Sequence, residues 1–195
     1  YSGPEDASET TRSEKTICPA GYYCVGGEKF ECPAGSLGEA GGQWNPTCDG
    51  QCPRGYYCVG GEKHECGSVD KYCPAGSSAP TNVTTGHYSG PSDVNENVRY
   101  EETLCPVGYY CVGGEKFECA SGYFGNSTGL TTSQCSGMCK DGYYCESGST
   151  RDDQHECGSV DKYCPAGSET PLVVPDGYYS GPEDASETTR SEKTI

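Results

Sequence analysis

Cysteine is the residue type with the most chemistry open to it in this 195-residue chain, which contains 16 of them. A thiol can form a disulfide, bind zinc or act as a nucleophile, and the spacing decides among these uses. Zinc sites usually contain Cys-x2-Cys or Cys-x4-Cys pairs, whereas the close pairs here are Cys48-x3-Cys52 and Cys135-x3-Cys139. Other gaps of five, seven and fifteen residues favour a disulfide framework, and we expect neither a metal site nor a cofactor.

Histidines offer the next candidates for catalysis. His64 and His155 both precede Glu-Cys, and both stand where Phe30 and Phe117 stand in related stretches. A position that accepts either His or Phe is typical of a half-exposed packing site and not of a general base. Because every cysteine has a disulfide role available, no Ser-His-Asp or Cys-His arrangement emerges, and we expect that the chain is not an enzyme.

The formal net charge is −16, which argues against a nucleic acid partner because phosphates attract basic surfaces. Acidic runs at residues 4–6 and 151–153 suggest calcium, but the sequence has no D-x-[DN]-x-[DN]-G loop. We interpret these runs as a solvated acidic surface.

Apolar residues are too few for an ordinary core, since Leu, Ile, Val and Phe together number only 20. Disulfides replace a core in small extracellular units, so the cysteines indicate an oxidising compartment and a secreted or cell-surface protein. No apolar run approaches the ~20 residues that a transmembrane helix needs, so we expect no membrane span. With neither Met nor a signal peptide at Tyr1, we expect a mature piece or a window of something larger.

Covalent sugar is a separate expectation. Asn82-Val83-Thr84 and Asn126-Ser127-Thr128 fit the N-x-[ST] acceptor pattern, whereas proline excludes Asn45-Pro46-Thr47. We therefore expect N-glycans on Asn82 and Asn126. Clusters of Ser and Thr are candidates for O-linked sugar at residues 10–11, 84–85 and 131–133.

Most of the cysteines and two of the three histidines lie in a stretch of sequence that is repeated along the chain. Residues 18–32, CPAGYYCVGGEKFEC, return at 52–66 with two changes and at 105–119 with one, and a looser copy at 139–157 has a loop longer by four residues. We expect residues 22–25 to run out as a strand, Gly-Gly to turn and the chain to run back, because both glycines tolerate positive φ.

A longer repeat contains these stretches. Residues 1–17 recur without a change as residues 179–195, a shift of 178 residues. The motif Tyr-Ser-Gly-Pro also begins at Tyr88, which divides the period into parts of 87 and 91 residues. We interpret this as a tandem array in which Ile195 leads into a copy of Cys18; a finite protein with just two copies is the alternative.

The sequence therefore predicts a small disulfide-rich fold, a tandem array of short β-hairpin modules with extended linkers and little or no helix. Polar, proline-containing segments separate the cysteine-rich pairs and have the composition of linkers. Apolar contacts of Pro171–Pro175 and Tyr178-Tyr179 can pack such a linker against the modules. We therefore expect extended or short-strand backbone that lies along the modules. The expected parts are linker 1–17, pair A at 18–73 (module 1, 18–48; module 2, 52–73), linker 74–104, pair B at 105–164 (module 3, 105–135; module 4, 139–164) and linker 165–195.

Disulfide connectivity is open, because eight cysteines in a pair of modules allow 105 pairings. We expect the first cysteine of a module to pair with the third across the hairpin base, and the second, near the turn, with the fourth. The main alternative joins Cys18 to Cys24 and Cys32 to Cys48. The expected disulfides are Cys18–Cys32, Cys24–Cys48, Cys52–Cys66, Cys58–Cys73, Cys105–Cys119, Cys111–Cys135, Cys139–Cys157 and Cys145–Cys164.

With its Cys-Pro-Ala-Gly-Tyr-Tyr-Cys, Cys-Pro-Arg-Gly-Tyr-Tyr-Cys and Cys-Pro-Ala-Gly-Ser motifs, the chain resembles ephrin-receptor-like cysteine-rich repeats of the GCC2/GCC3 type. The resemblance covers residues 18–73 and 105–164 and not the linkers. Such repeats occur in large surface proteins of protists and algae. The resemblance implies the type of module and says little about function.

Near-identical repeats suit a uniform fibre, because each step along it then makes equivalent contacts. We therefore expect a structural, glycosylated extracellular fibre whose partners are further repeats or chains of its own kind. The alternative is a cell-surface adhesion or receptor ectodomain in which the modules bind a ligand. Electron microscopy separates the two, as long threads or short stalks.

Overall fold

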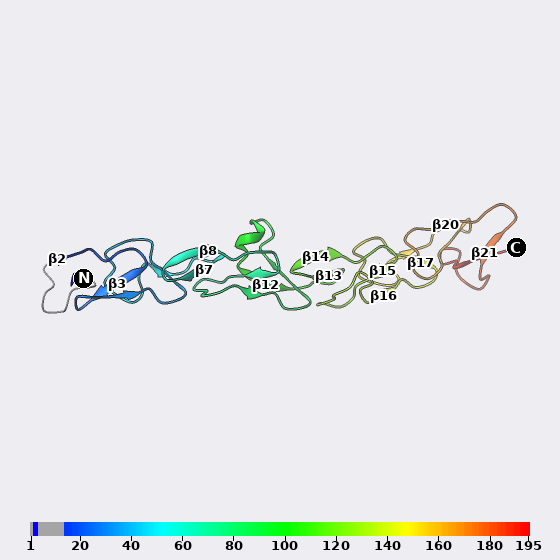
Figure 1. The fold of residues 1–195 in the computed structure, drawn as a ribbon. Coiled ribbons are helices and arrows are strands. Elements are labelled where there is room, and N and C mark those ends of the chain that lie inside the picture. Colours follow the sequence, from blue (N-terminus) through cyan, green and yellow to red (C-terminus); the bar gives the residue numbers. More distant parts are fainter. Residues whose placement is uncertain (1, 4–13) are drawn as a thin grey trace. The chain divides into compact units, whose positions relative to one another are not determined.

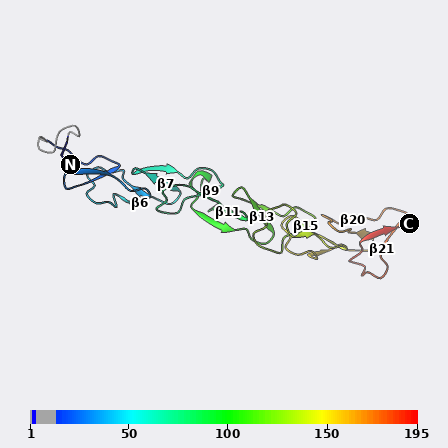
Figure 2. The same ribbon diagram turned by 60° about the horizontal axis from the view of Figure 1, so that its bottom comes forward.

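The computed structural model describes residues 2–3 and 14–195 and has the small, disulfide-rich, β-hairpin fold that the sequence predicts (Figure 1). Every sheet in these residues has two antiparallel strands, and the one helical element is the short 3-10 turn η1 (Glu96–Val98). The chain divides into two compact units, whose bounds are given below, and within each unit the strands labelled in the turned view follow one another in sequence order (Figure 2).

Three kinds of strand pair recur along the chain. The hairpins of the four modules pair β3 (Tyr22–Val25) with β4 (Glu28–Glu31), β7 (Tyr56–Val59) with β8 (Glu62–Glu65), β13 (Tyr109–Val112) with β14 (Glu115–Glu118) and β17 (Tyr143–Tyr144) with β18 (His155–Glu156). Modules 1 and 3 each contain a second, shorter strand pair, namely β5 (Ser36–Leu37) with β6 (Gly50–Gln51) and β15 (Tyr123–Phe124) with β16 (Gly137–Met138). The segments around the modules contribute β1 (Ser2–Gly3) with β2 (Glu14–Lys15), β9 (Lys71–Tyr72) with β10 (Thr81–Asn82), β11 (His87–Gly90) with β12 (Glu101–Leu104), β19 (Lys162–Tyr163) with β20 (Leu172–Val173) and β21 (Tyr179–Gly181) with β22 (Glu192–Thr194).

The Gly-Gly turns form as predicted. In module 1, Val25 pairs with Glu28 across the two glycines, whose φ angles are +61° and +85°. Module 4 absorbs its four extra residues at the same tip, so that Tyr144 still pairs with His155. The insertion shortens the strands β17 and β18 to two residues each, and in the enlarged tip Arg151 Nη2 lies 2.7 Å from Asp153 Oδ1.

Half-cystines form the core. All 16 cysteines lie in eight disulfides, and among the described residues the buried apolar side chains are cysteines without exception. Larger apolar side chains remain at the surface; Trp44 is 74% exposed and Val25 is 55% exposed. Sulfur therefore occupies the interior that aliphatic side chains fill in an ordinary domain.

The predicted connectivity was wrong. Each module pairs its first cysteine with its second and its third with its fourth, which is the alternative weighed above. None of the eight expected pairs, Cys18–Cys32, Cys24–Cys48, Cys52–Cys66, Cys58–Cys73, Cys105–Cys119, Cys111–Cys135, Cys139–Cys157 and Cys145–Cys164, is present. The observed disulfides are Cys18–Cys24, Cys32–Cys48, Cys52–Cys58, Cys66–Cys73, Cys105–Cys111, Cys119–Cys135, Cys139–Cys145 and Cys157–Cys164.

The turn before each hairpin explains the difference. The prediction took Cys18 to continue the line of β3 away from the turn, toward the open end of the hairpin. Instead the chain reverses at Pro19-Ala20-Gly21, where Tyr22 N donates to Pro19 O at 3.3 Å and Gly21 has a φ of +81°. This reversal places Cys18 beside Cys24 with a Cα–Cα distance of 5.7 Å, and Cys32 remains for the chain that follows.

The segments between the cysteine-rich pairs are built into the structure. Residues 74–104 contribute β10, η1 and strands β11 and β12, and they bind module 2 through its backbone. Gly67 N donates to Asn97 O at 3.1 Å, and Cys73 N donates to Arg99 O at 2.9 Å. The expectation of short-strand backbone along the modules is thus confirmed for this segment.

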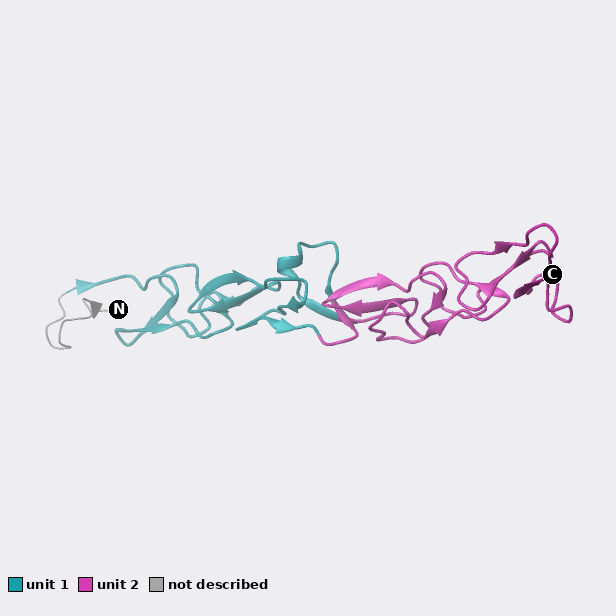
Figure 3. Ribbon diagram, turned by 45° about the vertical axis from the view of Figure 1, so that its right-hand side comes forward, with its two compact units in different colours: residues 1–83, 89–102 teal, residues 84–88, 103–195 magenta. Residues whose placement is uncertain are grey.

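The boundary between the two compact units does not coincide with the ends of the cysteine-rich pairs. Unit 1 comprises residues 1–83 and 89–102, and unit 2 comprises residues 84–88 and 103–195 (Figure 3). Residues 84–88 therefore group with module 3, although the sequence analysis placed them in a linker.

Tryptic mapping without reduction tests the connectivity in module 2. Trypsin leaves Cys52 in peptide 30–54 and one cysteine in each of the peptides 55–63, 64–71 and 72–99. Because the disulfides are local, we expect 55–63 linked to 30–54 and 64–71 linked to 72–99. Linkage of 64–71 to 30–54 would restore the pairing across the hairpin base and contradict the structure.

Candidate functional site: the joints between modules

The hairpin tips connect consecutive modules. In pair A, Gly38 N of module 1 donates to Gly61 O at the tip of module 2, at 2.9 Å, and Gly35 N donates to Cys58 O at the same distance. Gly61 lies so close to module 1 that a Cβ there would stand 2.7 Å from the Cα of Gly21. The second glycine of the tip therefore serves two purposes, since it makes the turn and it lets two backbones touch.

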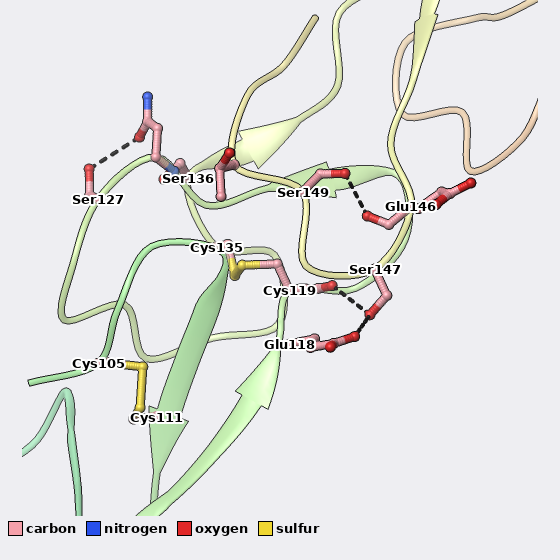
Figure 4. The surroundings of a disulfide bond; sticks show 12 residues. Cys105, Cys111, Glu118, Cys119, Ser127, Cys135, Ser136, Glu146, Ser147 and Ser149 are labelled. Atoms are coloured by element: carbon pink, nitrogen blue, oxygen red, sulfur yellow. Dashed lines mark hydrogen bonds between the residues drawn. A yellow bond between two sulfur atoms is a disulfide. The ribbon is translucent and has the colours of Figure 1, made fainter. Parts of the chain in front are cut away.

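Pair B repeats this joint with the altered tip of module 4. Gly125 N donates to Ser149 O at 2.9 Å, and Gly148 N donates to Cys119 O at 3.0 Å. The Ser147 hydroxyl lies beside the Cys119–Cys135 disulfide and donates to the Glu118 carboxylate at 2.8 Å (Figure 4). The joint thus survives replacement of the Gly-Gly tip, because backbone groups carry it.

Lysines and tyrosines line the hairpin of each module. The first tyrosine of each doublet lies under a lysine, as in module 1, where Lys29 Nζ is 4.5 Å from the centre of the Tyr22 ring. The second tyrosine stacks on the residue opposite, as Tyr23 does on Phe30 at 5.4 Å between centroids. The doublet therefore covers both faces of its own hairpin, and such pairs stabilise a two-stranded ribbon.

The two histidines that resembled catalytic candidates are stacking partners. His64 lies 5.1 Å from Tyr57 and His155 lies 5.1 Å from Tyr144, between ring centroids. These are the positions that Phe occupies in modules 1 and 3, so the expected packing role is confirmed for both.

A clasp of Ser and Arg recurs where β11 meets β12 and where β21 meets β22. Arg99 Nη1 donates to Ser89 O at 2.9 Å, and the buried Ser89 hydroxyl donates to Val69 O at 2.5 Å. In the second copy, Arg190 Nη1 donates to Ser180 O at 3.0 Å. The clasp ties each strand pair to the module before it, and sequence reasoning missed it although the serine stands in the repeated Tyr-Ser-Gly-Pro motif.

Two ionisable groups near the Ser89–Arg99 clasp have shifted pKa values. Burial raises the pKa of Tyr72, and the charge of Glu102, which accepts a hydrogen bond from the Tyr72 hydroxyl at 3.3 Å, raises this pKa further. A hydrogen bond from Ser68 lowers the pKa of Asp70 in the exposed turn before β9.

Both predicted N-glycan acceptors are exposed. Asn82 ends strand β10, and Asn126 follows β15 in the long loop of module 3. The Asn126 side chain accepts a hydrogen bond from Ser127 at 3.1 Å. The Asn45 side chain instead accepts from Thr47 N at 2.8 Å and so closes its own turn. Among the candidates for O-linked sugar, residues 84–85 and 131–133 are exposed, while residues 10–11 lie outside the described part of the chain.

Within residues 2–3 and 14–195, no three His, Cys, Asp or Glu side chains lie close enough together to hold a metal ion. In the same part of the chain, no helix is long and apolar enough to cross a membrane. Neither a protein-family model nor a curated protein sequence matches the chain.

Replacing Arg99 by Met tests the clasp. The change removes a charged donor from the Ser89 carbonyl, and such hydrogen bonds contribute roughly 1.5–3 kcal/mol. We expect faster amide exchange at Cys73 and Tyr100, whose N–H groups are bonded to this region, by about tenfold or more. Arg151→Met is the matched control, because its pair with Asp153 is at the surface and contributes at most ~1 kcal/mol. Equal effects of both changes would argue against the clasp.

Glycopeptide analysis of the native protein tests the acceptor sites. We expect sugar on Asn82 and Asn126, which are exposed, and none on Asn45, whose proline blocks transfer. Treatment with an amidase that releases N-glycans in ¹⁸O water should therefore label the first two residues as Asp. Unmodified asparagine at both Asn82 and Asn126 would contradict the predicted N-glycosylation.

Proposed function

We propose that this chain is a structural segment of a long extracellular fibre that is built from tandem 178-residue repeats. The observation that carries the proposal is the identity of residues 1–17 with residues 179–195. An unbroken match over this length indicates duplication of a whole period, because functional sites constrain scattered residues and not every residue of a polar segment.

The local structure of the two copies supports this interpretation. Ser2 pairs with Lys15 and Gly3 with Glu14, and the same register joins Ser180 to Lys193 and Gly181 to Glu192. Residues 1 and 4–13 lie outside the described part of the chain. Equal register at both positions is what a regular array requires, because each period must present the same contacts to the next.

The modules suit a load-bearing role. Their disulfides hold each hairpin without a hydrophobic core, and the joints use backbone groups that tolerate changes of side chain. The disulfide content indicates an extracellular or secreted protein, and the ephrin-receptor-like type of module is part of the proposal. Further repeats of the same kind are the proposed partners, and N-glycans would coat the surface.

An adhesion or receptor ectodomain is the second candidate. Exposed apolar residues such as Trp44 and Val173, which are 74% and 68% exposed, would favour it if they formed a ligand patch. Trp44 lies in module 1 and Val173 in the segment of residues 165–195, and the fibre accounts for more of the chain.

Electron microscopy and mass measurement of native material test the proposal. A fibre should appear as long threads of uniform width, and the reduced, deglycosylated chain should have a mass of several 178-residue periods. Short stalks on a cell surface, with a mass of one or two periods, would support the ectodomain instead.

A further inference from the structure

One face near the C-terminal end of unit 2 is bare where its counterpart within the same unit is covered. Residues 84–88 and residues 175–179 occupy equivalent places in the repeat, one at the start of unit 2 and the other near its end. Their local backbone is alike, since His87 N donates to Thr84 O at 3.0 Å and Tyr178 N donates to Pro175 O at 3.1 Å.

At the first of these places, module 3 packs on the segment. Gly86 is buried, and a Cβ there would stand 2.6 Å from the carbonyl oxygen of Gly129. Cys105 N donates to Gly86 O at 2.9 Å. Tyr88 forms a parallel bridge with Gly114 at the hairpin tip and lies 5.0 Å from Lys116 Nζ.

At the second place, the same groups face outward. Gly177, the counterpart of Gly86, is exposed, and a Cβ there would meet no atom within 4 Å. Tyr179, the counterpart of the half-buried Tyr88, is 47% exposed. A hollow of about 720 Å³ beside them is lined by residues that include Gly177, Tyr178 and Tyr179.

The sequence of module 1 matches this face. Module 1 differs from module 3 by a single residue over the hairpin stretch, and it supplies Gly27, Lys29 and Gly42 where module 3 supplies Gly114, Lys116 and Gly129. Its internal turn is also the same, because Gly42 N donates to Cys18 O at 2.7 Å as Gly129 N does to Cys105 O at 2.8 Å. Module 1 therefore contains counterparts of the module 3 residues that make the contacts described above.

We propose that Gly177, Tyr178 and Tyr179 form a docking face for a further copy of module 1 that follows in the same chain. In this joint the first cysteine of the added module donates its N–H to Gly177 O, its Gly42 packs on Gly177, and its Lys29 covers Tyr179. The inference rests on the tandem array of the proposed function and adds to it that consecutive periods are packed together and not loosely tethered.

The test compares the 195-residue chain with the same chain extended after Ile195 by a second copy of residues 18–73. Nitration of tyrosine by tetranitromethane, located by mass spectrometry, reports exposure of the Tyr179 ring. In the unextended chain Tyr179 should react faster than Tyr88; in the extended chain its rate should fall to that of Tyr88. The N–H of the first added cysteine should exchange as slowly as that of Cys105.

Two variants of the extended chain identify the face. Gly177→Val should restore fast nitration of Tyr179, because the new side chain meets the backbone of the added module. Gly26→Val is the matched control, since this glycine also has a positive φ, of +61°, but a Cβ there meets no atom within 4 Å. Tyr179 should stay protected in the control.

Three outcomes would overturn the inference. Tyr179 that reacts equally fast in both chains would show that the added module does not dock, and the array could still stand on microscopy and mass. Protection that survives Gly177→Val would place the contact on another face. Protection of Tyr179 in the unextended chain that grows with protein concentration would assign the face to a second molecule.

Discussion

The local disulfide is the constraint on which this structure depends. With so few aliphatic side chains, the chain has no interior that could hold a hairpin by hydrophobic burial, and a lone hairpin is marginal in water. Each sulfur bridge closes 6, 7 or 16 positions of sequence and stabilises its loop by roughly 2–3 kcal/mol through the unfolded state. Because no bridge spans two modules, each module is an independent covalent unit.

Because no disulfide joins two modules, noncovalent contacts hold the joints between them. Hydrogen bonds between backbones and close approaches of glycines connect one module to the next, as at Gly21, Gly38 and Gly61. Such contacts require the backbone to pass at the right place but ask little of the side chains. This explains why the joint of pair B tolerates the different tip of module 4, where Ser149 stands in place of Gly61.

Sequence alone predicted the hairpins well and the covalent links badly. Turn chemistry is local, so Gly26-Gly27 and the flanking tyrosines were enough to give the register of β3 and β4. The disulfides depend on where Cys18 lies after the turn at Gly21, and the pattern Pro-x-Gly was not interpreted as a reversal. The Ser89–Arg99 clasp was missed because its partners are ten residues apart and come together only when β11 and β12 pair.

The connectivity also decides how the chain responds to a pulling force. Force that enters a module crosses the Cys18–Cys24 and Cys32–Cys48 bonds directly, so the residues inside these loops carry no load. The residues between Cys24 and Cys32 are bridged by neither bond, so this segment, which contains the Gly26-Gly27 turn and β4, carries the load. When this segment is pulled straight, it spans at most roughly 25–30 Å. A module of this design therefore extends by only a limited length under force, and the positions of its disulfides set that limit.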